Sequence, residues 1–74
     1  MPAHKHEGLL TLRQRDVMEL LVRGLTNKGI AHTLRISPDT VRKHTMDIYA
    51  RLYVDNRVSA TVVWMALKGD GAQR

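Results

Sequence analysis

The 74-residue sequence contains no cysteine and no phenylalanine, and its only aromatic side chains are one tryptophan and two tyrosines. Without cysteine the chain has no disulfide framework, no thiolate nucleophile and no zinc site built on thiolates. The scarcity of aromatic side chains disfavours the RNA and single-strand readers that stack bases on aromatic platforms. Composition alone therefore disfavours disulfide-rich proteins, thiol-dependent enzymes, thiolate zinc proteins and base-stacking RNA readers.

The sequence also lacks a long apolar run. The longest, VVWMAL at residues 62–67, is far shorter than the roughly 20 residues that cross a bilayer. The amino-terminal segment MPAHKHEG carries no apolar core of a signal peptide. We therefore expect a cytoplasmic protein with no membrane partner.

Sequence motifs of catalysis are absent as well. There is no glycine-rich phosphate loop and no HExxH motif, and a chain this small is not expected to form a cleft of substrate size. We expect no enzymatic activity, no cofactor and no metal site. His4 and His6 flank Lys5 and would allow a metal pair, but no third ligand lies nearby in sequence, so a solvated arm is favoured.

Positive charge, by contrast, is in excess. Twelve Lys and Arg residues stand against seven Asp and Glu, giving a net charge of +5 and an isoelectric point of about 10.3. A basic small domain suggests a polyanionic partner, most often nucleic acid. The alternative is that the charge only keeps the domain soluble, and charge alone does not separate the two interpretations.

Capping residues and apolar spacing predict an all-α fold with four helices, at about residues 12–23, 27–34, 38–52 and 57–68. The first helix begins with a capping box of Thr11 and Gln14, and Gly24 is placed to end it in the left-handed conformation. We expect one domain at residues 10–69, preceded by a flexible arm or linker remnant at residues 1–9 and followed by a polar tail at residues 70–74.

The second and third helices predict a short helix, a tight turn and a longer helix, which is typical of helix-turn-helix DNA readers. Thr26 or Asn27 would cap the second helix, and Ser37 with Pro38 would start the third. One side of the third helix carries an apolar stripe with helical spacing, at Val41, Thr45, Ile48 and Leu52. Its other side carries Arg42, Lys43, Met46 and Tyr49. One face of the helix is therefore suited to packing in a core, and the other is suited to binding an anion.

The fourth predicted helix, between a cap at Asn56 and a stop at Gly69, is apolar nearly all round. Such a helix is expected to be buried on two sides. Because Trp64 would lose most by staying in water, we assign its side of the helix to the core, with Ala60, Val63, Trp64 and Leu67. The opposite side would form an exposed strip for a weak dimer contact, made of Val58, Val62, Met65 and Ala66.

Residues from Leu10 to about Ala60 resemble the LuxR-type (NarL/FixJ-type) helix-turn-helix domain. The family pattern reads roughly LTxRExEVLxLxxxGxxNKEIAxxLxISxxTVKxHxxxIxxKLxVxxRxxA, and this sequence matches it with NKGIA, ISPDTVRKH and VDNR at the same spacings. The resemblance implies the DNA-binding output domain of a bacterial transcription regulator. Such domains usually follow a phosphoacceptor or a ligand-sensing domain, and some stand alone; we expect a response regulator of a two-component system. The resemblance also implies dimer contact through the fourth helix.

The resemblance places Arg42, Lys43 and Met46 at the positions that face bases in the major groove. For Arg42, a bidentate guanine contact and a phosphate clamp both remain open. Phosphate contacts are expected from residues at helix starts, in the turn and beside the reading face, namely Asn27, Lys28, Arg35, Ser37, Thr40 and His44. The expected partner is double-stranded DNA with an inverted-repeat operator, bound in the bacterial nucleoid, with RNA polymerase as a further candidate.

Some positions depart from the family pattern. Gly29 replaces a glutamate, while Arg35 and Tyr53 stand where glycine or a small polar residue is common. If those turns need a positive φ, each side chain adds strain of about 1 kcal/mol. Arg57 is expected to pair with Asp16 or to face solvent.

Two further expectations concern surfaces. The polar side of the first helix is interpreted as a solvated face, formed by Arg13, Arg15, Asp16 and Glu19, and His32 is expected on the surface of the second helix. The alternative to DNA binding is a protein-interaction module whose basic helix docks an acidic partner of the transcription machinery. Competition by unlabelled duplex DNA would separate these two functions.

Overall fold

The computed structural model describes residues 9–72, and side chains within residues 9–68. It contains α1 (Leu12–Val22), α2 (Asn27–Leu34), α3 (Pro38–Leu52) and α4 (Arg57–Ala72), with no strand in the described range. The predicted all-α, four-helix fold is therefore confirmed. The histidine pair considered as a metal site, His4 and His6, lies outside the described residues. No helix in the described range has the length and hydropathy needed to cross a bilayer.

The helices begin where the capping chemistry predicts. Thr11 and Gln14 form a reciprocal capping box, with hydrogen bonds of 3.1 and 3.0 Å between each side chain and the other residue's N–H. Thr26, rather than Asn27, caps α2, because its hydroxyl accepts a first-turn N–H at 3.1 Å. Asn56 caps α4 in the same way at 2.8 Å. Local side-chain chemistry therefore sets where these helices begin.

The first three helices share one way of ending. One residue in the left-handed conformation lies just past each helix, with φ of 91° at Gly24, which follows Arg23, 60° at Arg35 and 59° at Tyr53. An apolar residue comes next in every case and packs partly buried against the core: Leu25, Ile36 and Val54. The N–H groups of both residues bond back to carbonyls of the last turn, as in a Schellman motif. The positive φ considered for Arg35 and Tyr53 is thus present, at a cost of about 1 kcal/mol or more each.

The fourth helix ends later than predicted. It passes through Gly69, which was expected to stop it, and continues to Ala72. A glycine inside a helix costs about 1 kcal/mol relative to alanine but removes no hydrogen bond, and no proline follows that would break the helix. Residues 70–72 of the expected polar tail are therefore helical.

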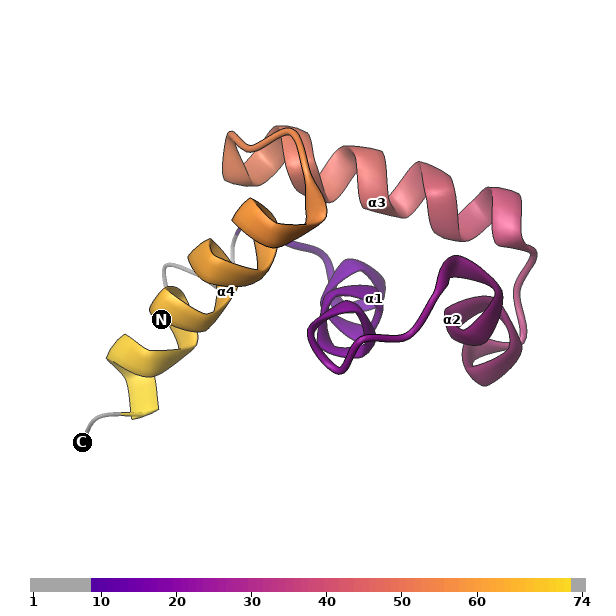
Figure 1. Cartoon of the computed structure of the whole chain (residues 1–74), viewed down its shortest axis with the longest axis horizontal. Coiled ribbons are helices and arrows are strands. Elements are labelled where there is room, and N and C mark those ends of the chain that lie inside the picture. Colours follow the sequence, from indigo (N-terminus) through magenta and orange to yellow (C-terminus); the bar gives the residue numbers. More distant parts are fainter. Residues whose placement is uncertain (1–8, 73–74) are drawn as a thin grey trace.

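Helix α3 is the centre of the fold and packs against each of the other three helices. In Figure 1 it runs along the top of the view, above α1 and α2, while α4 leads away from its carboxyl-terminal end. The predicted stripe is buried along its whole length, at Val41, Thr45, Ile48 and Leu52. Tyr49, which was placed on the opposite side, is half-buried against the core because it lies one turn after Thr45, beside the stripe.

Leu9 and Leu10 are the first residues that the structure describes, and both contact the core. Leu10 is buried in the core, and Leu9, which was assigned to the flexible arm, packs partly buried against it. Arg51 near the end of α3 donates a hydrogen bond of 3.2 Å to the Leu9 carbonyl. The segment that leads into α1 is therefore held by α3.

Arg57 joins the start of α4 to the end of α1. Its Nη2 atom donates to the carbonyls of Leu21 and Leu25, at 2.9 and 2.5 Å. The expected pairing with Asp16 is therefore wrong, and Asp16 instead lies 3.6 Å from Arg13. A guanidinium at a helix carboxyl terminus is stabilised by the last carbonyls and by the helix dipole, which outweighs pairing with an exposed carboxylate.

Glu19 is half-buried, not fully solvated as expected from its position on α1. Its carboxylate accepts hydrogen bonds from Trp64 Nε1 at 3.1 Å and from Lys68 Nζ at 2.8 and 2.9 Å. This acceptor allows Trp64 to be buried without losing a partner for its indole N–H. Partial burial raises the pKa of the Glu19 carboxyl, but the bonds from Lys68 and Trp64 lower it by more, so its pKa lies below the ordinary value.

The lowered pKa of Glu19 predicts a pH dependence of stability. A carboxyl of this kind stabilises the fold fully above its unfolded pKa, about 4.3, and the stabilisation is lost as pH falls through the folded pKa. We expect the free energy of unfolding to decline with acidification, and Glu19→Gln to remove part of that decline. Urea unfolding followed by the fluorescence of Trp64, the single tryptophan, measures both proteins across the acid range.

Asp16→Asn is the matched control, because it removes an exposed carboxylate of α1 whose contact is a surface ion pair with Arg13. Its pH profile should follow that of the wild type. Parallel profiles for Glu19→Gln and the wild type would contradict the assigned role of Glu19.

Candidate nucleic-acid interface

The side of α3 opposite the core carries the three residues expected to contact bases. Arg42, Lys43 and Met46 are all exposed, and Met46 keeps 64% of its surface in contact with solvent. At 3.6 residues per turn the three lie within an arc of about 100°. This face combines two cations with one large apolar side chain, which suits a groove lined by hydrogen-bond acceptors and thymine methyl groups.

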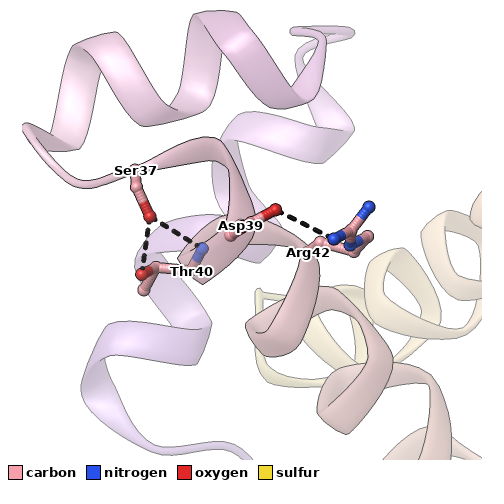
Figure 2. A network of polar contacts seen from close by, with 4 residues as sticks. All are labelled: Ser37, Asp39, Thr40 and Arg42. Carbon is pink, nitrogen blue, oxygen red and sulfur yellow. Dashed lines mark hydrogen bonds and ion pairs between the residues drawn. The ribbon is translucent and has the colours of Figure 1, made fainter.

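Arg42 is held by a neighbour that the sequence analysis did not single out. Its Nη2 atom donates to Asp39 Oδ1 at 2.8 Å, and both side chains are exposed (Figure 2). An exposed pair at this spacing contributes only about 0.3–0.5 kcal/mol, so a polyanion can displace it. The signal was present in the sequence, because an acid three residues before an arginine in a helix is a recognised ion-pair spacing.

Ser37 and Thr40 form the second contact at the start of α3. Ser37 Oγ accepts the Thr40 N–H at 3.1 Å, and the two hydroxyls are hydrogen-bonded to each other at 2.9 Å (Figure 2). Whichever hydroxyl donates, that contact uses one of the two O–H protons. The pair therefore offers one O–H donor to a phosphate in this arrangement, although both residues were expected to donate.

The start of α2 carries two further expected phosphate contacts. Asn27 and Lys28 occupy its first turn and are exposed. The first N–H groups of a helix have no acceptor inside the helix and carry partial positive charge. In α2, the Thr26 hydroxyl accepts a hydrogen bond from the N–H of Gly29. The main-chain donors of Asn27 and Lys28, together with the Lys28 ammonium, are thus suited to an anion.

The remaining two expected phosphate contacts differ in their surroundings. Arg35 is exposed in the turn between α2 and α3, and its neighbour Ile36 is partly buried against the core. His44 is half-buried on α3 beside the core stripe. His32 is exposed on α2, as expected.

Charge is concentrated where these elements meet. Helices α2 and α3 pack directly against each other, and residues 27–46 contain four Lys and Arg side chains against one carboxylate, that of Asp39. Among the described residues Arg42 pairs with Asp39, whereas Lys28 and Lys43 form no ion pair. The short helix α2, the turn and the longer helix α3 therefore form a cationic surface.

The two sides of α4 are as predicted. Ala60 and Trp64 are buried, while Val63 and Leu67 pack partly buried against the core. The opposite side is an exposed apolar strip, formed by Val58, Val62, Met65 and Ala66. In Figure 1, α4 lies at the end of α3 opposite to α2. The strip thus belongs to a different part of the molecule from the start of α2.

Comparison with known proteins identifies this arrangement. Residues 8–64 match the family described as bacterial regulatory proteins, luxR family. The chain is 41% identical over 62 residues to the nitrate/nitrite response regulator protein NarP of Escherichia coli K12, covering 84% of this chain and 29% of NarP. It is 40% identical over 53 residues to the nitrate/nitrite response regulator protein NarL of the same strain, covering 72% of this chain and 24% of NarL.

A third relative differs in length from the first two. The HTH-type transcriptional regulator AlkS of Ectopseudomonas oleovorans is 37% identical over 59 residues, covering 80% of this chain and 7% of AlkS. The chain thus spans less than a third of each of these relatives. The matched range contains the first three helices and the first half of α4. The chain therefore belongs to the luxR family of bacterial regulatory proteins and is a helix-turn-helix DNA-binding domain of that family.

Proposed function

We propose that this domain is the output domain of a bacterial transcription regulator and reads duplex DNA with α3 in the major groove. The observation that carries the proposal is the division of α3 into a buried stripe and an exposed face with two cations and a methionine. Fifteen helical residues span roughly 22 Å, and the major groove, about 12 Å wide, admits a helix.

In this proposal the exposed face of α3 contacts DNA bases, and residues around that face contact the DNA phosphates. Arg42 makes a bidentate contact with guanine O6 and N7, Lys43 lies on the same edge, and Met46 packs against a thymine methyl. The contacts to DNA phosphates come from Asn27, Lys28, Arg35 and His44, and from the one free O–H of the Ser37 and Thr40 pair. Phosphate contacts set the register of the helix, whereas base contacts set the preferred sequence.

The regulator that contains this domain is proposed to be a response regulator of a two-component system, because NarP and NarL carry that description. It would act in the cytoplasm, bound to the nucleoid, and its contact to RNA polymerase would be made from the promoter. The proposal requires no catalytic step by this chain.

Selection of bound duplexes from a randomised pool tests the central assignment. We expect one sequence to be enriched, and log K for that duplex to fall against log salt with a slope of about −4 to −5 if about five phosphates are neutralised. Arg42→Ala should relax the preference at one base position and cost about 1–3 kcal/mol. Lys28→Ala should weaken all duplexes alike and make the salt slope shallower by about 1.

Arg13→Ala is the charge-matched control, since Arg13 is an exposed arginine of α1 that pairs with Asp16, outside the proposed interface. It should change binding less than Lys28→Ala. A pool without enrichment, or a flat salt profile, contradicts the proposed function. If Arg42→Ala weakens every duplex equally, Arg42 is a phosphate clamp. Binding that an acidic protein displaces and duplex DNA does not would favour the interaction-module alternative.

The exposed strip of α4 is proposed to form a weak two-fold contact between two domains on DNA. Val58, Val62 and Met65 are 73%, 63% and 56% exposed, and they lie on one side of the helix. A strip of four side chains buries less area than the standard stable interface of about 1,600 Å². The dimer would therefore form on an inverted repeat, with half-sites about one helical turn apart, and dissociate in dilute solution.

Val62→Glu tests this contact. Because Val62 is exposed, the fold should remain intact while the added charge abolishes cooperative binding to a duplex with two half-sites. Binding to a single half-site should change far less. Fluorescence anisotropy with one-site and two-site duplexes measures both affinities.

Leu12→Glu is the control, because it places the same charge at an apolar position on α1 that is even more exposed than Val62. It should preserve cooperativity. An unfolded Val62→Glu protein would show that the strip belongs to the core, and unchanged cooperativity would show that α4 does not form the dimer.

A further inference from the structure

We propose that Asp39 is a specificity-determining residue of the DNA interface, because its carboxylate holds the Arg42 guanidinium on the base-reading face of α3. The inference rests on the proposed function, in which α3 enters the major groove and Arg42 reads a base. It adds Asp39, whose role is to position Arg42.

The position of Asp39 on α3 supports this role. In a helix of 3.6 residues per turn, Asp39 lies about 60° from Arg42 and about 40° from Lys43, on the arc between them. Its carboxylate thus lies in the middle of the exposed face and not at its border. Of the two cations, the structure pairs it with Arg42, through the 2.8 Å contact drawn in Figure 2.

The chemistry of arginine makes this contact compatible with base reading. A guanidinium is planar and carries five N–H donors in a fixed fork. Asp39 engages the Nη2 atom of Arg42, so one donor is used and four are left, enough for a paired contact to guanine O6 and N7. Because the carboxylate also restrains the plane of the guanidinium, less side-chain freedom is lost when the base contact forms.

Asp39 also disfavours a contact between Arg42 and a DNA phosphate. If Arg42 turns to a phosphate, Asp39 loses its partner and leaves a bare negative charge beside the DNA backbone. If Arg42 stays on the base edge, the pair is kept. Asp39 therefore penalises non-specific binding more than specific binding, and specificity is a difference between those two affinities. The pair is exposed and weak, so it biases Arg42 without blocking it.

A purely structural role for Asp39 makes a different prediction. The residue lies in the first turn of α3, where the helix dipole favours a carboxylate. That role alone would change the stability of the domain and leave the choice between duplexes unchanged. A measurement of sequence discrimination thus separates the two roles.

The probes are the duplex enriched by selection with the wild-type chain, its single-base variants and a scrambled duplex of the same length and composition. Asp39→Asn keeps the size of the side chain and removes its charge. We expect it to bind the scrambled duplex more tightly and to lower the affinity ratio of selected to scrambled duplex about twofold, the scale of one exposed ion pair. Asp39→Glu, which restores the carboxylate, should recover much of the ratio.

Two comparisons isolate the effect. Asp47→Asn makes the same charge change at another exposed position of α3, and it should keep the ratio near the wild-type value. In an Arg42→Ala background, Asp39→Asn should no longer change the ratio, because the two residues act as a unit. Circular dichroism and Trp64 fluorescence establish that every variant is folded.

The proposal is overturned if Asp39→Asn tightens all duplexes by the same factor, or if it changes the ratio equally in the Arg42→Ala background. If the wild type is selective and Arg42→Ala keeps the same base preference, Arg42 does not read a base, and this inference is wrong as well. A wild-type chain that enriches no sequence instead removes the proposed function itself.

Discussion

The contact on which the rest of the structure depends is the burial of one side of α3 against the other three helices. Val41 and Ile48 are fully buried, and burial of side chains of this size contributes about 1.5–3 kcal/mol each. Because the stripe commits that side to the core, a helix with 3.6 residues per turn must turn Arg42, Lys43 and Met46 outward. The packing that stabilises the domain thus also determines which face can read DNA.

The turns before and after α3 depend on the same core. Arg35 and Tyr53 adopt the left-handed conformation that glycine adopts without strain, and the apolar residues that follow them, Ile36 and Val54, pack against the core. Burial of those neighbours offsets the strain and fixes the chain direction at both ends of α3. The angle at which the reading helix meets α2 and α4 is therefore set by packing, although the turn sequences depart from the family pattern.

The features predicted correctly from the sequence depend on residues close together in the chain. Caps at Thr11, Ser37 and Asn56 and the stripe on α3 involve spacings of three or four residues, and the size of Trp64 identified the buried side of α4. Contacts across the fold were missed, because Arg57 reaches carbonyls 32 and 36 positions away and Glu19 meets Trp64 45 positions away. Those contacts depend on how helices are placed, which local spacing does not specify. Asp39 was missed although its pairing is local, because only the cations of the reading face were considered.

Nuclear magnetic resonance titration of the isotope-labelled chain tests most directly whether the exposed face of α3 is the DNA-binding surface. The titrant is a duplex with a single half-site, so that dimer contacts do not contribute. We predict that the largest changes occur in the amide signals of the first turn of α2 and the exposed face of α3, and in the Arg42 side chain. The exposed strip of α4 should change little. Changes concentrated on α1 or α4, with the Arg42 and Met46 signals unmoved, would contradict the account.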